Sequence, residues 1–107
     1  MTYSIFVNAG ISVTHCNGTS NRSSECRVCG SWINHWENYR QYAFGKCCLC
    51  NNGKKEVGAH VKIESKSGEW IIPTCKSCNS QGGSHKLLYD IYAVSAIQCS
   101  ENVLNRQ

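Results

Sequence analysis

Three Cys-x-x-Cys pairs constrain this chain more than any other feature: Cys26/Cys29, Cys47/Cys50 and Cys75/Cys78. A Cys-x-x-Cys turn directs two thiolates at one point, which is the arrangement that a tetrahedral zinc ion needs. Three such pairs within 107 residues predict a small domain built around metal. A chain of this length has a thin core, so a structural zinc worth on the order of 10 kcal/mol would be a valuable staple.

Disulfide bonds are the competing use of these thiols. The chain has nine cysteines, so complete pairing would leave one over. Residues 1–16 hold no Lys or Arg and no long apolar run, so they do not resemble a signal peptide. No stretch reaches the roughly 18 apolar residues that cross a membrane. We therefore expect zinc rather than disulfides, a reducing cytoplasmic location and no membrane partner.

The residue pattern predicts an α+β fold with several short strands. Strands are expected at 3–7, 11–14, 56–63 and 70–72. Pro73 is expected to stop the last of these. Residues 84–98 fit either a helix or a strand, and residues 99–107 look like a loose tail.

Two helices are expected between these strands. Aromatic residues at three- and four-residue steps predict a helix over 31–44, with Ser31 as its cap and Gly45 at its end. A shorter helix is predicted over 75–81, with Thr74 as its cap.

A tetrahedral site needs four ligands, so the pairs must combine. Cys26/Cys29 could join Cys47/Cys50 across 17 residues, a usual spacing for a zinc ribbon. Alternatively, Cys47/Cys50 could join the pair that opens the second helix, across 24 residues that hold two predicted strands. We favour this second pairing, because thiolates at a helix N-terminus gain from the helix dipole. Its four ligands would be Cys47, Cys50, Cys75 and Cys78, and the order of knuckle, hairpin and helix is that of a treble clef.

The remaining pair, Cys26 and Cys29, would then hold a second zinc ion with other partners. The candidates are His15, Cys16, His35 and Cys48. The competing interpretation is that Cys16, Cys48 and Cys99 are small buried thiols.

Residues 46–81 resemble the zinc-stapled HNH nuclease motif, the ββα-metal fold. The matching segments are Cys47-x-x-Cys50, then Val57-Gly58-Ala59-His60-Val61, then Ile72-Pro73-Thr74-Cys75-Lys-Ser-Cys78-Asn79. The resemblance implies that His60 is a general base beside Mg²⁺ or another divalent ion, and that Asn79 helps to orient this base or to hold the hairpin. Ala59, however, stands where the family has its first catalytic-metal ligand, and a methyl group cannot coordinate. We therefore expect an inactive scaffold.

The domain prediction follows from this resemblance. Residues 1–107 are expected to form one zinc-binding domain. Within it, 1–45 would carry the N-terminal knuckle and the aromatic helix, 46–98 the HNH-like treble clef, and 99–107 the tail.

The charge balance permits contact with nucleic acid. The chain carries 11 Lys and Arg against 7 Asp and Glu, a mild basic excess. Trp70 or Tyr89 could stack on an unpaired base. The lysines expected to contact DNA or RNA phosphates are Lys54, Lys55, Lys62, Lys76 and Lys86.

The favoured function is thus a non-catalytic nucleic-acid-binding module. The alternatives are a metal-dependent endonuclease with His60 as base, and a protein-interaction adaptor. The adaptor would display Trp32, Trp36 and Tyr39 of the aromatic helix to a protein partner.

Overall fold

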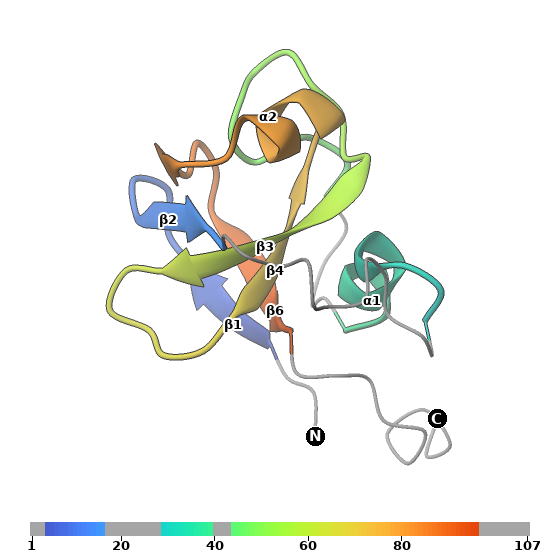
Figure 1. The fold of residues 1–107 in the computed structure, drawn as a ribbon, viewed down its shortest axis with the longest axis horizontal. Coiled ribbons are helices and arrows are strands. Elements are labelled where there is room, and N and C mark those ends of the chain that lie inside the picture. The colour runs from blue at the N-terminus through green and yellow to red at the C-terminus, as the bar shows by residue number, and fades with distance from the viewer. Residues whose placement is uncertain (1–3, 17–28, 40–43, 97–107) are drawn as a thin grey trace.

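The computed structural model describes residues 4–16, 29–39 and 44–96. Within them, six strands form one sheet in the order β1-β6-β4-β3-β2-β5, and every neighbouring pair is antiparallel (Figure 1). The strands are β1 (Ser4–Val7), β2 (Ser12–His15), β3 (Val57–Ile63), β4 (Trp70–Thr74), β5 (Ser84–Lys86) and β6 (Ile91–Ser95). Two helices accompany them, α1 (Trp32–Tyr39) and α2 (Lys76–Gln81). The predicted α+β class is confirmed.

The inner face of the sheet carries the larger core. On β3, side chains alternate between faces, so Ala59 and Val61 both point inward and are buried. The turn between β1 and β2 bonds to the chain just after β5 at the border of this core. Gly10 N–H donates to the Leu87 carbonyl at 2.8 Å, and Leu87 N–H donates to the Ile11 carbonyl at 3.0 Å.

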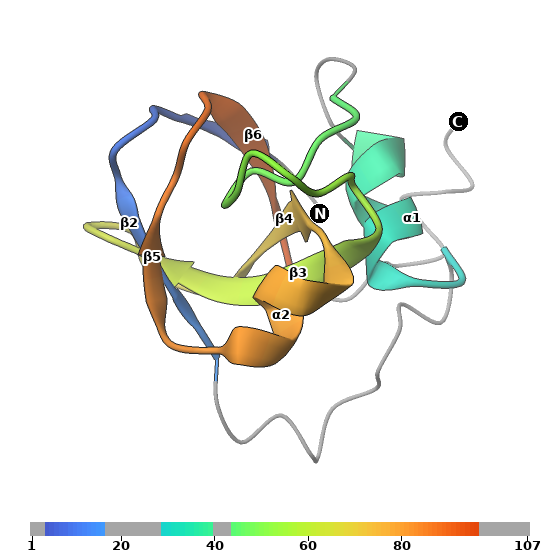
Figure 2. The ribbon, with the colours of Figure 1, turned by 90° about the horizontal axis from the view of Figure 1, so that it is seen from above.

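Helix α1 covers the opposite face, which we call the outer face. Trp36 packs there against Ile71 of β4 and Val94 of β6, and all three are fully buried. Gly58 permits the close approach, since a Cβ there would lie 2.7 Å from the Trp32 carbonyl carbon. Figures 1 and 2 show α1 on one side of β3 and β4, with β2 on the other.

The strand expected over 70–72 does not stop at Pro73. Strand β4 runs on to Thr74, and Pro73 pairs with Gly58 of β3. Strand β6 pairs with β4 only at Trp70 and Ile71, so no sheet partner requires an N–H from Pro73 on that side. Its carbonyl is used instead, accepting from the Cys48 N–H at 3.0 Å.

The observed helix boundaries differ from the predicted ones at two points. Cys75, not Thr74, is the N-cap of α2, and its sulfur accepts from the Cys78 N–H. Ser31 caps α1 as expected, since its Oγ accepts from the Asn34 N–H at 3.1 Å. The expected end of that helix was wrong, because Phe44 is not helical.

The ambiguous segment over 84–98 resolves into strands. Its described part, up to Ala96, forms two strands. Strand β5 pairs with β2, and strand β6 pairs with both β1 and β4. The tail predicted over 99–107 lies outside the described residues. Because β1 and β2 pair with later strands, the segments 1–45 and 46–98 contribute to one shared sheet.

Candidate metal centre

Four cysteine sulfurs converge at one end of the inner core. The sulfurs of Cys47, Cys50, Cys75 and Cys78 all lie within 4.8 Å of one another. The Cys50 and Cys75 sulfurs are 3.8 Å apart. Four thiolates at about 2.3 Å from a tetrahedral zinc ion stand about 3.8 Å from one another. The cluster therefore has the dimensions of a zinc site, as the second of the two predicted pairings requires.

The first two ligands come from a tight turn before β3. Cys47 N–H donates to the Gly53 carbonyl at 3.1 Å, which closes the loop between them. Leu49 N–H points at the Cys47 sulfur at 3.4 Å. A backbone N–H aimed at sulfur favours the thiolate, which is the form that binds metal.

The other two ligands come from the first turn of α2. Cys75 caps the helix, and the Cys78 N–H lies 3.4 Å from its sulfur. Glu56 supports this start, because its carboxylate accepts from the Lys76 N–H at 2.9 Å. Glu56 is not among the predicted site residues, because it lies 20 positions before Lys76 in the chain and only the fold brings it to the helix start.

Gly53 is the residue that lets these two halves meet. A Cβ on Gly53 would lie 2.6 Å from the Cys75 Cβ and 2.8 Å from the Cys75 sulfur. It would also lie 3.2 Å from the Cys50 sulfur. Position 53 therefore requires glycine because any larger side chain would collide with Cys75 and crowd the Cys50 sulfur.

The thiols of the cluster differ in acidity without a metal. Burial raises the pKa of Cys47 and of Cys78, while the Asn52 backbone N–H lowers the pKa of Cys50 to about 7. A divalent cation would draw protons from such thiols and balance the resulting thiolate charges.

Cys48 stands beside this cluster as a buried thiol. It is fully buried, and burial raises its pKa well above the ordinary value. Its backbone links two segments, since Cys48 N–H donates to Pro73 and its carbonyl accepts from Leu88 N–H at 2.9 Å. The placement fits the interpretation of Cys48 as a small core residue.

A second contact joins predicted ligands on the outer face. The Cys29 sulfur lies 3.8 Å from His35 Nδ1. His35 is fully buried in α1, and burial lowers its pKa. Cys26, the predicted companion of Cys29, lies outside the described residues, as does Cys99.

The other two candidate partners of Cys29 lie at the end of β2, on opposite faces. His15 points inward, where its ring meets that of His85 at 5.3 Å between centroids. Burial, followed by the charge of His85, lowers the pKa of His15. Cys16 follows on the outer face, and its N–H donates to the His60 carbonyl at 3.0 Å. Of the two, only Cys16 shares a face with His35.

The residues implied by the HNH resemblance lie on different sides of the hairpin. His60 alternates with the inward-facing Ala59, so it points to the outer face, where its ring packs edge-on against Trp32 at 4.6 Å. Asn79 is exposed on α2, which begins at the cysteine cluster of the inner core. This arrangement gives no support to a shared role for His60 and Asn79.

The predicted phosphate-binding lysines do not all gather in one place. Lys62 and Lys86 are exposed on the strands that flank β2. Lys54 and Lys76 are exposed near the cysteine cluster, next to Gly53 and Cys75 in the chain. Lys55 is engaged elsewhere, in an ion pair with Glu37 and 5.6 Å from the centre of the Trp36 ring.

Two of the aromatic rings offered as possible contact surfaces are buried. Trp70 is 5% exposed and its indole N–H donates to the Ser67 carbonyl, so it offers no stacking surface. Trp36 is fully buried and donates to the Tyr92 carbonyl at 2.8 Å. An adaptor surface on α1 would therefore lack its central ring. Tyr89 is half-buried, with Lys46 over its ring at 5.3 Å.

Comparisons with known proteins give no assignment. No family model matches this chain, and no curated protein or solved structure matches it either. Among residues 4–16, 29–39 and 44–96, no helix is long and apolar enough to span a membrane. The function must therefore be argued from the site.

Proposed function

We propose that this protein is a zinc-stabilised treble-clef module that binds nucleic acid and does not cleave it. The observation that carries the proposal is the convergence of four cysteine sulfurs at one point. A site with four thiolate ligands is closed, because no position remains for water or substrate. Such a zinc ion holds structure rather than performing catalysis.

The order of elements around the cysteines supports the treble-clef assignment. A turn carrying Cys47 and Cys50 precedes the β3–β4 hairpin, and α2 follows with Cys75 as its cap. This is also the frame of the HNH resemblance. The frame lacks the family's catalytic-metal ligand, since Ala59 is a buried methyl group on the inner face.

A polar face beside the hairpin is the surface proposed to meet phosphates. Thr14 of β2 pairs with Lys62 on one side and with Ser84 on the other, and Ser12 pairs with Lys86. The Thr14 and Ser84 hydroxyls bond each other at 2.9 Å. Two exposed lysines and these hydroxyls can contact phosphate oxygens without reading bases.

Fluorescence anisotropy with labelled single- and double-stranded DNA and RNA tests this proposal. The variant is Lys62→Ser/Lys86→Ser, and the matched control is Lys54→Ser/Lys76→Ser, which removes the same charge elsewhere. The first pair is expected to lower the slope of log K against log salt by about 1 to 2, because each lost phosphate contact removes about 0.7 to 0.9. The control is expected to change it less. Equal effects of the two pairs, or no binding by the wild type at low salt, would refute the proposal.

A plasmid-cleavage assay tests the non-catalytic part. The wild type is expected to leave plasmid intact with Mg²⁺, Mn²⁺ or Ni²⁺. Cleavage that His60→Ala abolishes while zinc content stays unchanged would reverse this conclusion.

A further inference from the structure

A second set of donor atoms lies on the outer face of the sheet, where α1 begins. The Cys29 sulfur is 3.8 Å from His35 Nδ1. In a tetrahedral zinc site, a thiolate at about 2.3 Å and an imidazole nitrogen at about 2.0–2.1 Å stand about 3.6 Å apart. The observed separation is close to that of two ligands sharing one ion.

The orientation of the His35 ring fits a metal ligand. Its Nε2 lies 2.8 Å from the Ser95 carbonyl oxygen, within the buried core under α1. A carbonyl can only accept, so Nε2 carries the proton and Nδ1 turns its lone pair toward Cys29. A histidine that binds metal through one nitrogen ordinarily donates from the other to a carbonyl or carboxylate.

The chain around Cys29 is held by the start of α1. Gly30 follows with a φ of 96°, a left-handed conformation that glycine adopts readily. The Asn34 side-chain amide then donates to the Cys29 carbonyl at 3.2 Å. The thiol is therefore positioned by the same helical turn that carries His35.

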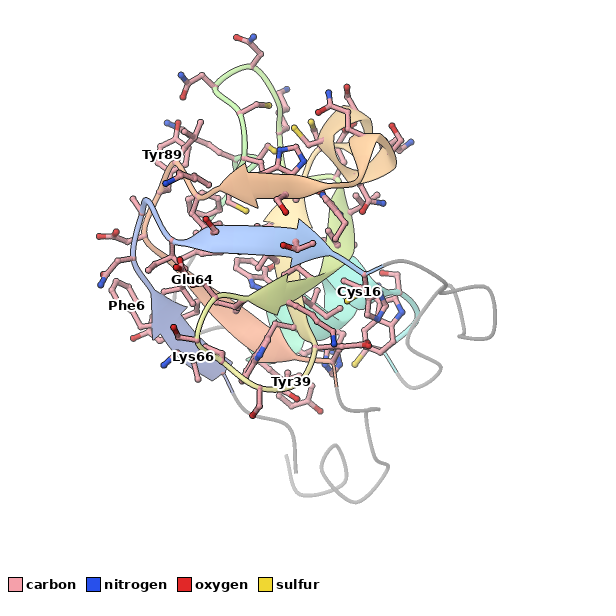
Figure 3. All side chains as sticks on the ribbon, turned by 60° about the vertical axis from the view of Figure 1, so that its left-hand side comes forward. Phe6, Cys16, Tyr39, Glu64, Lys66 and Tyr89 are labelled. Atoms are coloured by element: carbon pink, nitrogen blue, oxygen red, sulfur yellow. The ribbon has the colours of Figure 1, made fainter. Side chains whose placement is uncertain are left out.

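Cys16 is another described thiol on this face of the sheet. Its N–H donates to the His60 carbonyl, and strand alternation puts its side chain on the same outer face as that of His60. The His60 ring contacts Trp32, which in turn contacts His35 at 5.1 Å between centroids. Figure 3 shows Cys16 where β2 ends.

We propose that Cys29 and His35 bind a second zinc ion, separate from the four-cysteine centre, with Cys16 as a further ligand. The proposal does not depend on nucleic-acid binding. Among the described residues, only the first centre already brings three or more donors within 4.8 Å of one another. The second site is a preformed pair, Cys29 and His35, and the Cys16 donor atom does not lie within 4.8 Å of both.

Zinc stoichiometry of the purified full chain is the first test. The wild type is expected to hold two zinc ions, and Cys29→Ser and His35→Gln one each. The matched control is His85→Gln. This histidine also bonds a carbonyl, with Nε2 2.8 Å from Gly82 oxygen, but its ring meets His15 rather than a thiol. The control is expected to keep both ions. One zinc ion in the wild type, or unchanged zinc in His35→Gln, would overturn the proposal.

X-ray absorption at the zinc edge keeps the test decisive if a variant fails to fold, because it can use the wild type alone. Two sites predict a sulfur shell at about 2.3 Å together with a nitrogen contribution at about 2.0–2.1 Å. A sulfur shell alone would overturn the proposal.

A His35→Cys variant tests the ligand role of His35 separately, since a thiolate can replace the imidazole as ligand but cannot restore the bond to the Ser95 carbonyl. It is expected to recover the zinc that His35→Gln loses, with no nitrogen contribution. Failure to recover it would assign His35 a packing role only.

Discussion

The two faces of the β3–β4 hairpin carry cysteine sites of different completeness. On the inner face, Cys47 and Cys50 from a turn meet Cys75 and Cys78 from a helix start, and all four donors are assembled. On the outer face, Cys29 just before α1 and His35 in its first turn are in contact as a pair. In both, a cysteine stands at or just before the start of a short helix.

This difference indicates what each metal would hold together. The inner cysteines belong to the same core as Ala59, Val61 and Leu87, so a zinc ion bound there would tie the turn, the hairpin and α2 into that core. The outer pair consists of Cys29, just before α1, and His35 in its first turn, and Trp36 of this helix already packs against Ile71. We therefore expect the inner ion to be required for the fold and the outer ion to fix one helix.

The largest expected effect comes from removing a ligand of the inner centre. Cys75→Ser should lose the inner zinc and its cooperative unfolding transition, because a structural zinc is worth on the order of 10 kcal/mol while a whole domain is stable by about 5–15 kcal/mol. Zinc analysis and urea unfolding followed by circular dichroism measure this. Cys48→Ala, at a fully buried neighbouring thiol, is the control and should keep the zinc. A stable, cooperatively folded Cys75→Ser protein would contradict the assigned role.

Loss of the outer ion should have a local effect. In Cys29→Ser, backbone amides of α1 are expected to exchange with solvent at least tenfold faster, while those of β3 and β4 stay protected. Hydrogen exchange with mass spectrometry reads both regions in one experiment. Equal acceleration in α1 and in the hairpin would remove the distinction drawn between the two sites.

Gly53→Ala tests the close approach at the inner centre. The added methyl would crowd Cys75, so zinc affinity should fall and stability should drop by about 1–3 kcal/mol, the usual range for overpacking. Gly45→Ala is the matched control, because a Cβ there meets nothing within 4 Å. Chelator competition and urea unfolding measure the two effects. Equal zinc affinity in both variants would show that the turn can accommodate the added methyl group, and would contradict the role assigned to Gly53.

The ligands of the inner centre could largely be predicted from sequence, because each Cys-x-x-Cys pair is a short-range pattern. The pairs Cys47/Cys50 and Cys75/Cys78, with strand patterns between them, lead to the four-cysteine cluster that is observed. The end of β4 could not be derived in this way. Whether Pro73 interrupts a strand depends on the fact that β6 pairs only with residues 70 and 71 of β4.

The outer site could be predicted only in part from sequence, because its geometry also depends on contacts between residues far apart in the chain. The spacing of Cys29 and His35 marks them as candidates, but the bond from His35 to Ser95 joins residues 60 positions apart. Strand alternation puts the side chains of His15 and Cys16 on opposite faces of the sheet. Which face each takes follows only from the position of β2 in the sheet. The face of His60 likewise depends on where α1 packs.

Acidity should weaken the inner zinc in a characteristic way. Protons compete with zinc for thiolates, so affinity falls as pH falls. The raised pKa values of Cys47 and Cys78 mean that at least two protons leave on binding between pH 7 and 8, a slope of about 100-fold per pH unit. Below about pH 7, where Cys50 also takes up a proton, the slope should steepen. Competition with a calibrated chelator in Cys29→Ser protein isolates this centre, and a shallower slope would contradict the ligand set.

The smallest expected effect lies in a contact between the inner turn and α1. Lys55 follows the inner turn, pairs with Glu37 of α1 and lies over the Trp36 ring. Both charged groups are partly buried, at 21% and 28% exposed. Because an exposed ion pair contributes about 0.2–1 kcal/mol and a cation–π contact about 0.5–1 kcal/mol, Lys55→Met should cost about 1 kcal/mol.

A double-mutant cycle with Lys55→Met and Glu37→Gln separates the two terms of this contact. The coupling between the variants should be about 0.5 kcal/mol and should shrink at high salt, while the part due to the Trp36 ring should remain. Urea unfolding at low and high salt measures both. Zinc content should stay unchanged in all three proteins, because the link joins the regions without belonging to either site. A loss of zinc in Lys55→Met would instead show that α1 and the inner turn depend on each other for metal binding.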